Sequence, residues 1–140
     1  MNIWRRQVLT FVVGLFSATV ATADFDGSKQ LLCSFGQVTE CDAGEVCREV
    51  SHESVDAPDF VELDFRKKQI VSITAGQSSQ ADEMTVTDLG GFLIVQGTQG
   101  SGQGDSLGYS LSIEQATGRL VAAGAGENAG FIIFGACTYN

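Results

Sequence analysis

Apolar and polar side chains alternate along the chain after Pro58, and this period of two constrains the fold more than any other feature. The clearest stretch is 107–114, where small or polar residues separate Leu107, Tyr109, Leu111 and Ile113. Successive side chains of a β-strand leave opposite faces, so such a stretch buries one face and exposes the other. The pattern therefore predicts a chain of short, half-buried strands.

Turn-forming residues separate these strands. The polar segment 66–69, the pair Gly90-Gly91 and the pair Thr117-Gly118 each join two apolar runs, and Gly-Gly accepts the positive φ of a tight hairpin. Long helical periodicity is missing, although Val46–Val50 fits a strand or a short helix and Ser51 is placed to cap a single helical turn. About eight or nine strands predict an all-β fold, an antiparallel up-and-down meander that forms a barrel or a strongly curled sheet.

The first 23 residues have the order of a cleavable secretory signal helix. Arg5 and Arg6 precede an apolar run over 8–20, and Ala21-Thr22-Ala23 supplies the small residues of a cleavage site. A membrane-spanning helix is the alternative, but this run is shorter than the roughly 20 apolar residues that crossing requires. We expect cleavage after Ala23 and a single mature domain over 24–140, periplasmic or secreted, with no membrane anchor.

All four cysteines lie in the mature part, which export delivers to an oxidising compartment. Four cysteines allow three pairings. Cys41 and Cys47 enclose a short loop with the turn-permitting Gly44, whereas Cys33 and Cys137 lie in the first and last apolar runs. We therefore predict the disulfides Cys41–Cys47 and Cys33–Cys137, the second of which requires the first and last strands to be neighbours.

The mature chain is strongly acidic. The first 23 residues contain two of the eight Lys and Arg residues and none of the 17 Asp and Glu residues, so the mature net charge is −11. Such a charge repels nucleic acids and anionic membrane surfaces and attracts cations or basic partners. We therefore expect no nucleic-acid partner.

Two runs are apolar at every position, Phe92–Val95 and Phe131–Phe134, although a half-buried strand needs apolar residues on one face only. The N-terminal segment and the disulfide loop are expected to cover the outer side; the alternative is a protein partner or a second copy of the chain. A ligand inside the barrel would instead occupy a cavity lined by Tyr109, Leu111 and Phe92. The candidate ligand or partner surface consists of Phe92, Ile94, Tyr109, Leu111, Ile132 and Phe134.

No catalytic, metal or cofactor motif is complete. His52 is the sole histidine, so a general-base scheme would need it together with nearby acids such as Asp56 and Asp59. Gly124–Ala129 has the glycine spacing of a dinucleotide turn but leads into a strand instead of a helix. Asp24–Gly27 begins like a calcium loop without its later ligands, and the cysteine gaps exceed zinc-ligand spacing. We expect no catalytic residue, no metal and no cofactor.

Five short motifs follow one another along the mature chain: Leu32-Cys33, Cys41-Asp42-Ala43-Gly44 with Cys47, Pro58-x-Phe60, Val95-Gln96-Gly97 and Phe134-Gly135-Ala136-Cys137-Thr138. In these motifs the chain resembles a group of small, uncharacterised exported bacterial proteins. The four-cysteine frame and the Phe-Gly-Ala-Cys-Thr ending are the distinctive parts. The resemblance implies export and a cysteine-stabilised β domain, and it assigns no role to any residue.

These features favour an exported, non-catalytic binding or interaction domain. A small periplasmic hydrolase is one alternative, and it requires His52 inside a pocket with a nucleophile or a water molecule in reach. A structural envelope protein, whose relevant property is durability, is the other.

Overall fold

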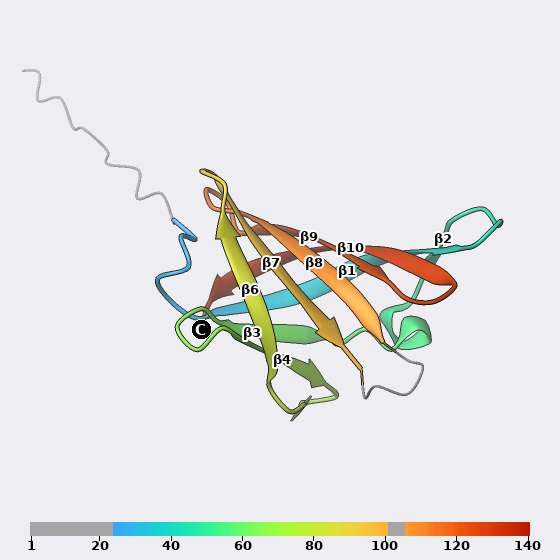
Figure 1. Cartoon of the computed structure of the whole chain (residues 1–140), viewed down its shortest axis with the longest axis horizontal. Coiled ribbons are helices and arrows are strands. Elements are labelled where there is room, and N and C mark those ends of the chain that lie inside the picture. Colours follow the sequence, from blue (N-terminus) through green and yellow to red (C-terminus); the bar gives the residue numbers. More distant parts are fainter. Residues whose placement is uncertain (1–23, 101–105) are drawn as a thin grey trace, which may run out of the picture.

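The computed structural model describes residues 24–100 and 106–140, so the predicted signal helix and its cleavage site lie outside the described residues. The described chain consists of strands and one 3-10 turn, η1 (His52–Val55) (Figure 1). The strands are β1 (Leu31–Asp42), β2 (Arg48–Val50), β3 (Phe60–Asp64), β4 (Gln69–Thr74), β5 (Gln77–Ser78), β6 (Asp82–Asp88), β7 (Phe92–Gln99), β8 (Leu107–Glu114), β9 (Arg119–Ala125) and β10 (Ala129–Tyr139).

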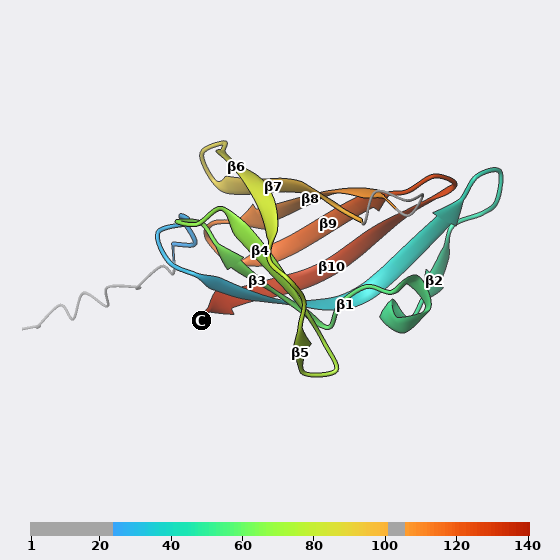
Figure 2. The same cartoon turned by 60° about the horizontal axis from the view of Figure 1, so that its bottom comes forward.

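The sheet closes on itself as an antiparallel barrel (Figure 2). From β3 through β10 each barrel strand pairs with the next one along the chain, and β1 joins the two ends of this series because it pairs with both β3 and β10. The short strands β2 and β5 lie off the ring, paired to β1 and β4, which leaves eight of the ten strands in the barrel. The predicted all-β up-and-down architecture is confirmed.

Both predicted disulfides are present. Cys33 on β1 lies directly opposite Cys137 on β10 and is bonded to it, which joins residues 104 positions apart. Cys41 is bonded to Cys47 across the turn between β1 and β2. Disulfides persist in oxidising surroundings, so this pair of bridges indicates a non-cytoplasmic protein.

The turns form where the sequence predicts them. In the β3–β4 turn, Oδ1 of Asp64 accepts hydrogen bonds from the backbone N–H groups of Arg66 (3.1 Å) and Lys67 (3.0 Å). The bond from Lys67, followed by one from the Gln30 side chain, holds the pKa of Asp64 below its ordinary value. In the β6–β7 turn, Gly90 and Gly91 have φ angles of 68° and 117°, which other residues rarely adopt.

The segment between β1 and β3 was ambiguous in sequence and is mostly extended. β2 is a strand, and Ser51 lies at the N-cap of η1 as predicted, although its side chain makes no capping hydrogen bond. The turn ends at Asp56, whose φ of 51° is left-handed. The chain then passes through Pro58 into β3, and this brings the segment 55–58 against the barrel interior.

One end of the barrel, termed the closed end, is filled by Phe25. The Phe25 backbone N–H donates to the carbonyl of Gln115 (2.9 Å), and the Phe25 ring stacks on that of Tyr139 with centroids 4.9 Å apart. Gly118 permits this contact, because a Cβ at that position would lie 2.8 Å from the Phe25 ring. The largest fully buried side chains are Leu31, Leu63, Leu93, Ile113 and Leu120.

At the other end, termed the open end, β4 and β6 part from each other (Figure 1). They share only the pairs Gln69–Glu83 and Ile70–Asp82, and the far half of β4 pairs with β5 instead. The barrel wall is therefore incomplete between these strands at the open end.

Removing each disulfide separately should have unequal effects on stability. In the chain-entropy model a closed loop of about 100 residues contributes about 5 kcal/mol and a loop of about six contributes about 2 kcal/mol. We expect the variant Cys33→Ala/Cys137→Ala to lose the larger amount and Cys41→Ala/Cys47→Ala the smaller, measured by guanidinium denaturation. Equal losses would contradict the role assigned to the Cys33–Cys137 bridge.

Candidate functional site

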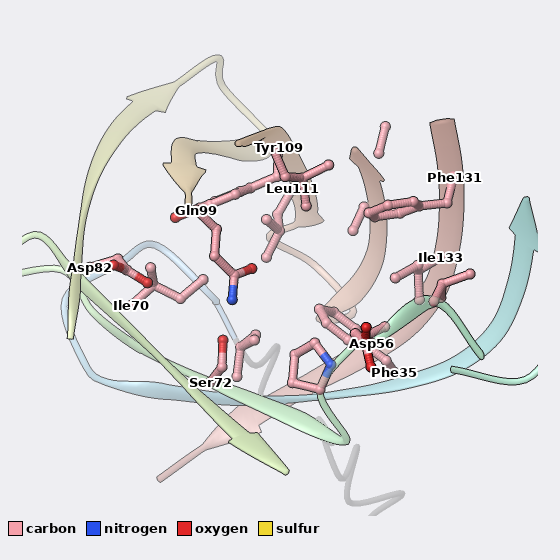
Figure 3. Close-up of a pocket in the computed structure, with 17 residues that line it drawn as sticks. Phe35, Asp56, Ile70, Ser72, Asp82, Gln99, Tyr109, Leu111, Phe131 and Ile133 are labelled. Carbon is pink, nitrogen blue, oxygen red and sulfur yellow. The ribbon is translucent and has the colours of Figure 1, made fainter. Parts of the chain in front are cut away.

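A cavity of about 70 Å³ lies in the barrel interior at the open end (Figure 3). Its inner part is apolar, with the buried side chains of Val61, Leu111 and Ile133 among its lining. Ala57 and Pro58, after η1, contribute to another wall. The cavity is thus an outward continuation of the core, bounded by strands and by the segment that leads into β3.

Two aromatic rings lie over glycines of neighbouring strands and shape this space. Tyr109 of β8 is paired with Gly97 of β7, and Phe131 of β10 with Gly124 of β9. A Cβ at position 97 would lie 2.5 Å from Cζ of Tyr109, and one at position 124 would lie 2.5 Å from Cε2 of Phe131. Each ring therefore occupies the volume that a side chain on the adjacent strand would need.

The hydroxyl group of Tyr109 is buried and has no hydrogen-bond partner among the described residues. Its burial raises the pKa of Tyr109 to about 12, and the negative charge of Asp82 acts in the same direction. A buried polar atom left without a partner costs roughly 1–3 kcal/mol. The oxygen has almost no accessible surface, so a ligand atom could bond to it only after a neighbouring side chain moves.

Polar groups gather around the outer part of the cavity. Asp56, Ser72, Asp82 and Gln99 belong to its lining, and Figure 3 shows the Gln99 side chain extending into the space. No Lys, Arg or His is part of the lining within the described residues. The cavity thus combines an apolar interior with a mouth that carries two carboxyl groups and no basic group.

The six residues of the predicted ligand or partner surface divide into two groups. Tyr109 and Leu111 line the cavity, as the interior hypothesis requires. Phe92 does not line it, and that part of the prediction is wrong: on β7 the buried residues are Leu93 and Val95, so alternation turns Phe92 outward. Ile94, Ile132 and Phe134 also lie outside the cavity lining.

The outward-facing residues form a second feature, the outer apolar face, which consists of Phe92, Ile94, Val121, Ile132 and Phe134. Four of these side chains have exposed fractions of 46% (Phe92), 41% (Val121), 42% (Ile132) and 48% (Phe134). The predicted cover by the N-terminal segment and the disulfide loop is not found in the described residues, because the described N-terminal segment instead fills the closed end. Val121 was not among the residues predicted from the sequence for this surface.

Strands β7 to β10, which carry the outer apolar face, contain one acidic and one basic residue, Glu114 and Arg119. These two form a salt bridge with a distance of 3.4 Å between Arg119 Nε and Glu114 Oε2. The four strands are therefore neutral in a chain whose formal net charge is −9.

His52 lies apart from the cavity lining. Its Nε2 atom is 3.4 Å from Oδ1 of Asp59, and both side chains are 35% exposed. Together with Glu53, Asp56 and Thr74 they line a second depression, which shares Asp56 and Ala57 with the cavity lining. His52 is thus paired with one of the acids that sequence analysis considered with it.

In the described part of the chain, no three His, Cys, Asp or Glu side chains converge as a metal site requires. Asp26, from the calcium-like segment, accepts a hydrogen bond from the backbone N–H of Ser28 (2.8 Å). Hydrogen bonding by the Ser28 side chain, and then by this N–H, lowers the pKa of Asp26. Within residues 24–100 and 106–140, no helix has the length and apolar character needed to cross a membrane.

The sequence did not single out several residues of the cavity lining, among them Phe131, Asp82, Gln99 and Ser72. Gly97 and Gln99 continue the inward series that begins at Leu93 and Val95, so the signal was present as a period of two. The inward face of this run could not be chosen from the sequence, because the run is apolar at every position from 92 to 95.

Comparisons with protein-family models, with curated proteins and with solved structures find no match to this chain.

The environment of Tyr109 predicts a late titration. In the unaltered protein, Tyr109 should ionise with a midpoint near pH 12, whereas an ordinary tyrosine ionises near pH 10. The corresponding rise in tyrosinate absorbance should be absent from Tyr109→Phe. Because the folded state favours the neutral phenol, the stability that it contributes is complete below pH 10 and is lost as the pH rises toward 12. A spectrophotometric titration of both proteins measures the midpoint.

The variant Gly97→Ala tests the ring-over-glycine contact. The added methyl group should displace the Tyr109 ring into solvent and bring the Tyr109 midpoint back toward 10. Gly108→Ala is the matched control, because Gly108 is adjacent to Tyr109 in β8 and a Cβ there meets no atom within 4 Å. An unchanged midpoint in Gly97→Ala would refute the packing argument.

Proposed function

We propose that the protein is an exported, non-catalytic binding domain that takes a small organic ligand into the open end of its barrel. An apolar cavity that is continuous with the core and has polar groups at its mouth carries this proposal. Apolar pockets with a few well-placed polar groups are typical ligand sites. The alternative of a periplasmic hydrolase would use His52, which does not take part in the cavity lining.

The size of the cavity limits the ligand. A dry protein cavity of about 150 Å³ holds a benzene molecule, and the space in this barrel is about 70 Å³. A short branched alkyl group is therefore a suitable occupant, with its polar end at the mouth beside Tyr109 and Gln99.

Export to the periplasm or the medium belongs to the same proposal. The order of charged, apolar and small residues over 1–23 supports it, as do the two disulfides, which form in oxidising compartments. A ligand of this domain would then be a small molecule outside the cytoplasm.

The neutral probe 2-methylpropan-1-ol tests ligand binding. We expect it to shift the amide NMR signals of Gly97, Tyr109 and Leu111, with a Kd on the order of 1 mM because so few atoms make contact. Ala122→Leu should abolish the shifts, since Ala122 is 6% exposed and lines the cavity. Ala125→Leu, at an exposed position of the same strand, is the control. Failure of this alcohol and of its amine and carboxylate analogues to bind at Tyr109 would refute the function.

The outer apolar face supports a second function, association with another copy of the chain. Exposed apolar side chains that gather on one side of a domain mark interaction sites, and Val121 and Phe134 are paired neighbours on β9 and β10. A second copy fits because the surrounding strands are neutral, with Glu114 and Arg119 already paired, so two acidic chains can meet there without placing their carboxylates together.

Sedimentation analysis of the oxidised mature protein tests this association. We expect a concentration-dependent dimer that Phe134→Glu dissociates, because the change places a charge within the apolar contact. Val46→Glu is the control, since Val46 is 89% exposed and lies in the disulfide loop away from the face. A monomer at all concentrations would rule out the second function.

A further inference from the structure

We propose that the ligand of the open end is a small alkylammonium ion, with its alkyl group in the cavity and its charged group at the mouth, which carries Asp82 and Asp56 on different sides. This inference rests on the proposed function and adds the chemical class of the ligand. It follows from three separate properties of the cavity: its charges, its unpartnered oxygen and its aromatic rings.

The charges of the lining have one sign. Asp56 and Asp82 come from different parts of the chain, after η1 and at the start of β6, and both line the cavity. No basic side chain within the described lining neutralises them, and neither carboxyl group has a hydrogen bond or salt bridge among the described contacts. An anion would therefore meet two like charges, whereas a cation would meet two opposite charges.

The Tyr109 oxygen supplies a second contact. A phenol oxygen both donates and accepts hydrogen bonds, so the Tyr109 oxygen can accept one from an ammonium N–H group once a side-chain movement exposes it. The negative charge of Asp82 contributes to the raised pKa of this phenol, so the carboxylate lies close enough to the hydroxyl group to interact with it. A cation placed between them would satisfy the buried oxygen and neutralise the carboxylate together.

The rings of Tyr109 and Phe131 supply a third property. Both line the cavity, and Phe35 is a further aromatic residue of the lining (Figure 3). Aromatic faces attract cations through their quadrupole, and the attraction grows where water is excluded. The same rings provide the apolar surface that an alkyl group buries.

Three probes of similar shape and different charge test the inference: 2-methylpropan-1-amine, which is protonated at neutral pH, 2-methylpropan-1-ol and 3-methylbutanoate. Titrations followed by the amide signals of Gly97 and Tyr109 give the three affinities. We expect the amine to bind about fivefold more tightly than the alcohol at low salt, and the carboxylate to bind more weakly than both. In about 1 M salt, where the screening length is about 3 Å, the advantage of the amine should fall.

Neutral isosteres identify the groups responsible. Asp82→Asn, and then Asp82→Asn combined with Asp56→Asn, should remove the preference for the amine while alcohol binding persists, which shows that the cavity is intact. Glu62→Gln is the matched control, because it removes one acid from β3 at a position outside the cavity lining.

The outcomes separate the inference from the function on which it rests. Equal affinities for amine and alcohol, or tightest binding of the carboxylate, would overturn the ammonium assignment and leave the binding function in place. Binding of none of the three probes would overturn both. A preference for the amine that survives in the double variant would also refute the roles of Asp82 and Asp56.

Discussion

The pairing of β1 with β10 is the interaction on which the rest of the structure depends. It runs from Leu31 opposite Tyr139 to Asp42 opposite Ala129, and it turns an open meander into a closed wall with an interior. The Cys33–Cys137 bond fixes its register, because a slip of one residue would turn every side chain of a strand to the other face. Without this closure there is neither a single core nor a cavity.

The same interior is filled at one end and left partly vacant at the other, and the sizes of the inward side chains make the difference. Toward the closed end, large residues such as Leu93 and Ile113 meet, and Phe25 completes the packing. Toward the open end, the inward positions of β7 and β9 include Gly97 and Gly124, which the rings of the adjacent strands cover. Each ring takes the volume of the side chain that the glycine lacks, so each such pair of positions contributes one side chain to the interior instead of two.

Charge is distributed unevenly around the barrel, and this gives the two candidate surfaces different chemistry. Strands β7 to β10 carry one neutralised pair, Glu114 with Arg119, so their outer side attracts apolar partners without a strong field. The mouth of the cavity carries Asp56 and Asp82 without a basic neighbour in its described lining. The outer apolar face therefore suits association between copies, whereas the cavity suits a small ligand of opposite charge.

Local features of the sequence determined the strands, the turns and the Cys41–Cys47 pair. A period of two, a Gly-Gly pair and a short loop between Cys41 and Cys47 act over a few residues, so their outcome does not depend on distant parts of the chain. Only the tertiary structure decided which way Phe92 faces, because a run that is apolar at every position satisfies either orientation. The pairing of Leu93 with Ile113 and of Val95 with Leu111 directs Leu93 and Val95 into the barrel and Phe92 outward. Closure of the barrel then places Asp82 and Tyr109 in the lining of the same cavity. Such a space is set by contacts between strands that lie far apart in sequence, which a local pattern does not contain.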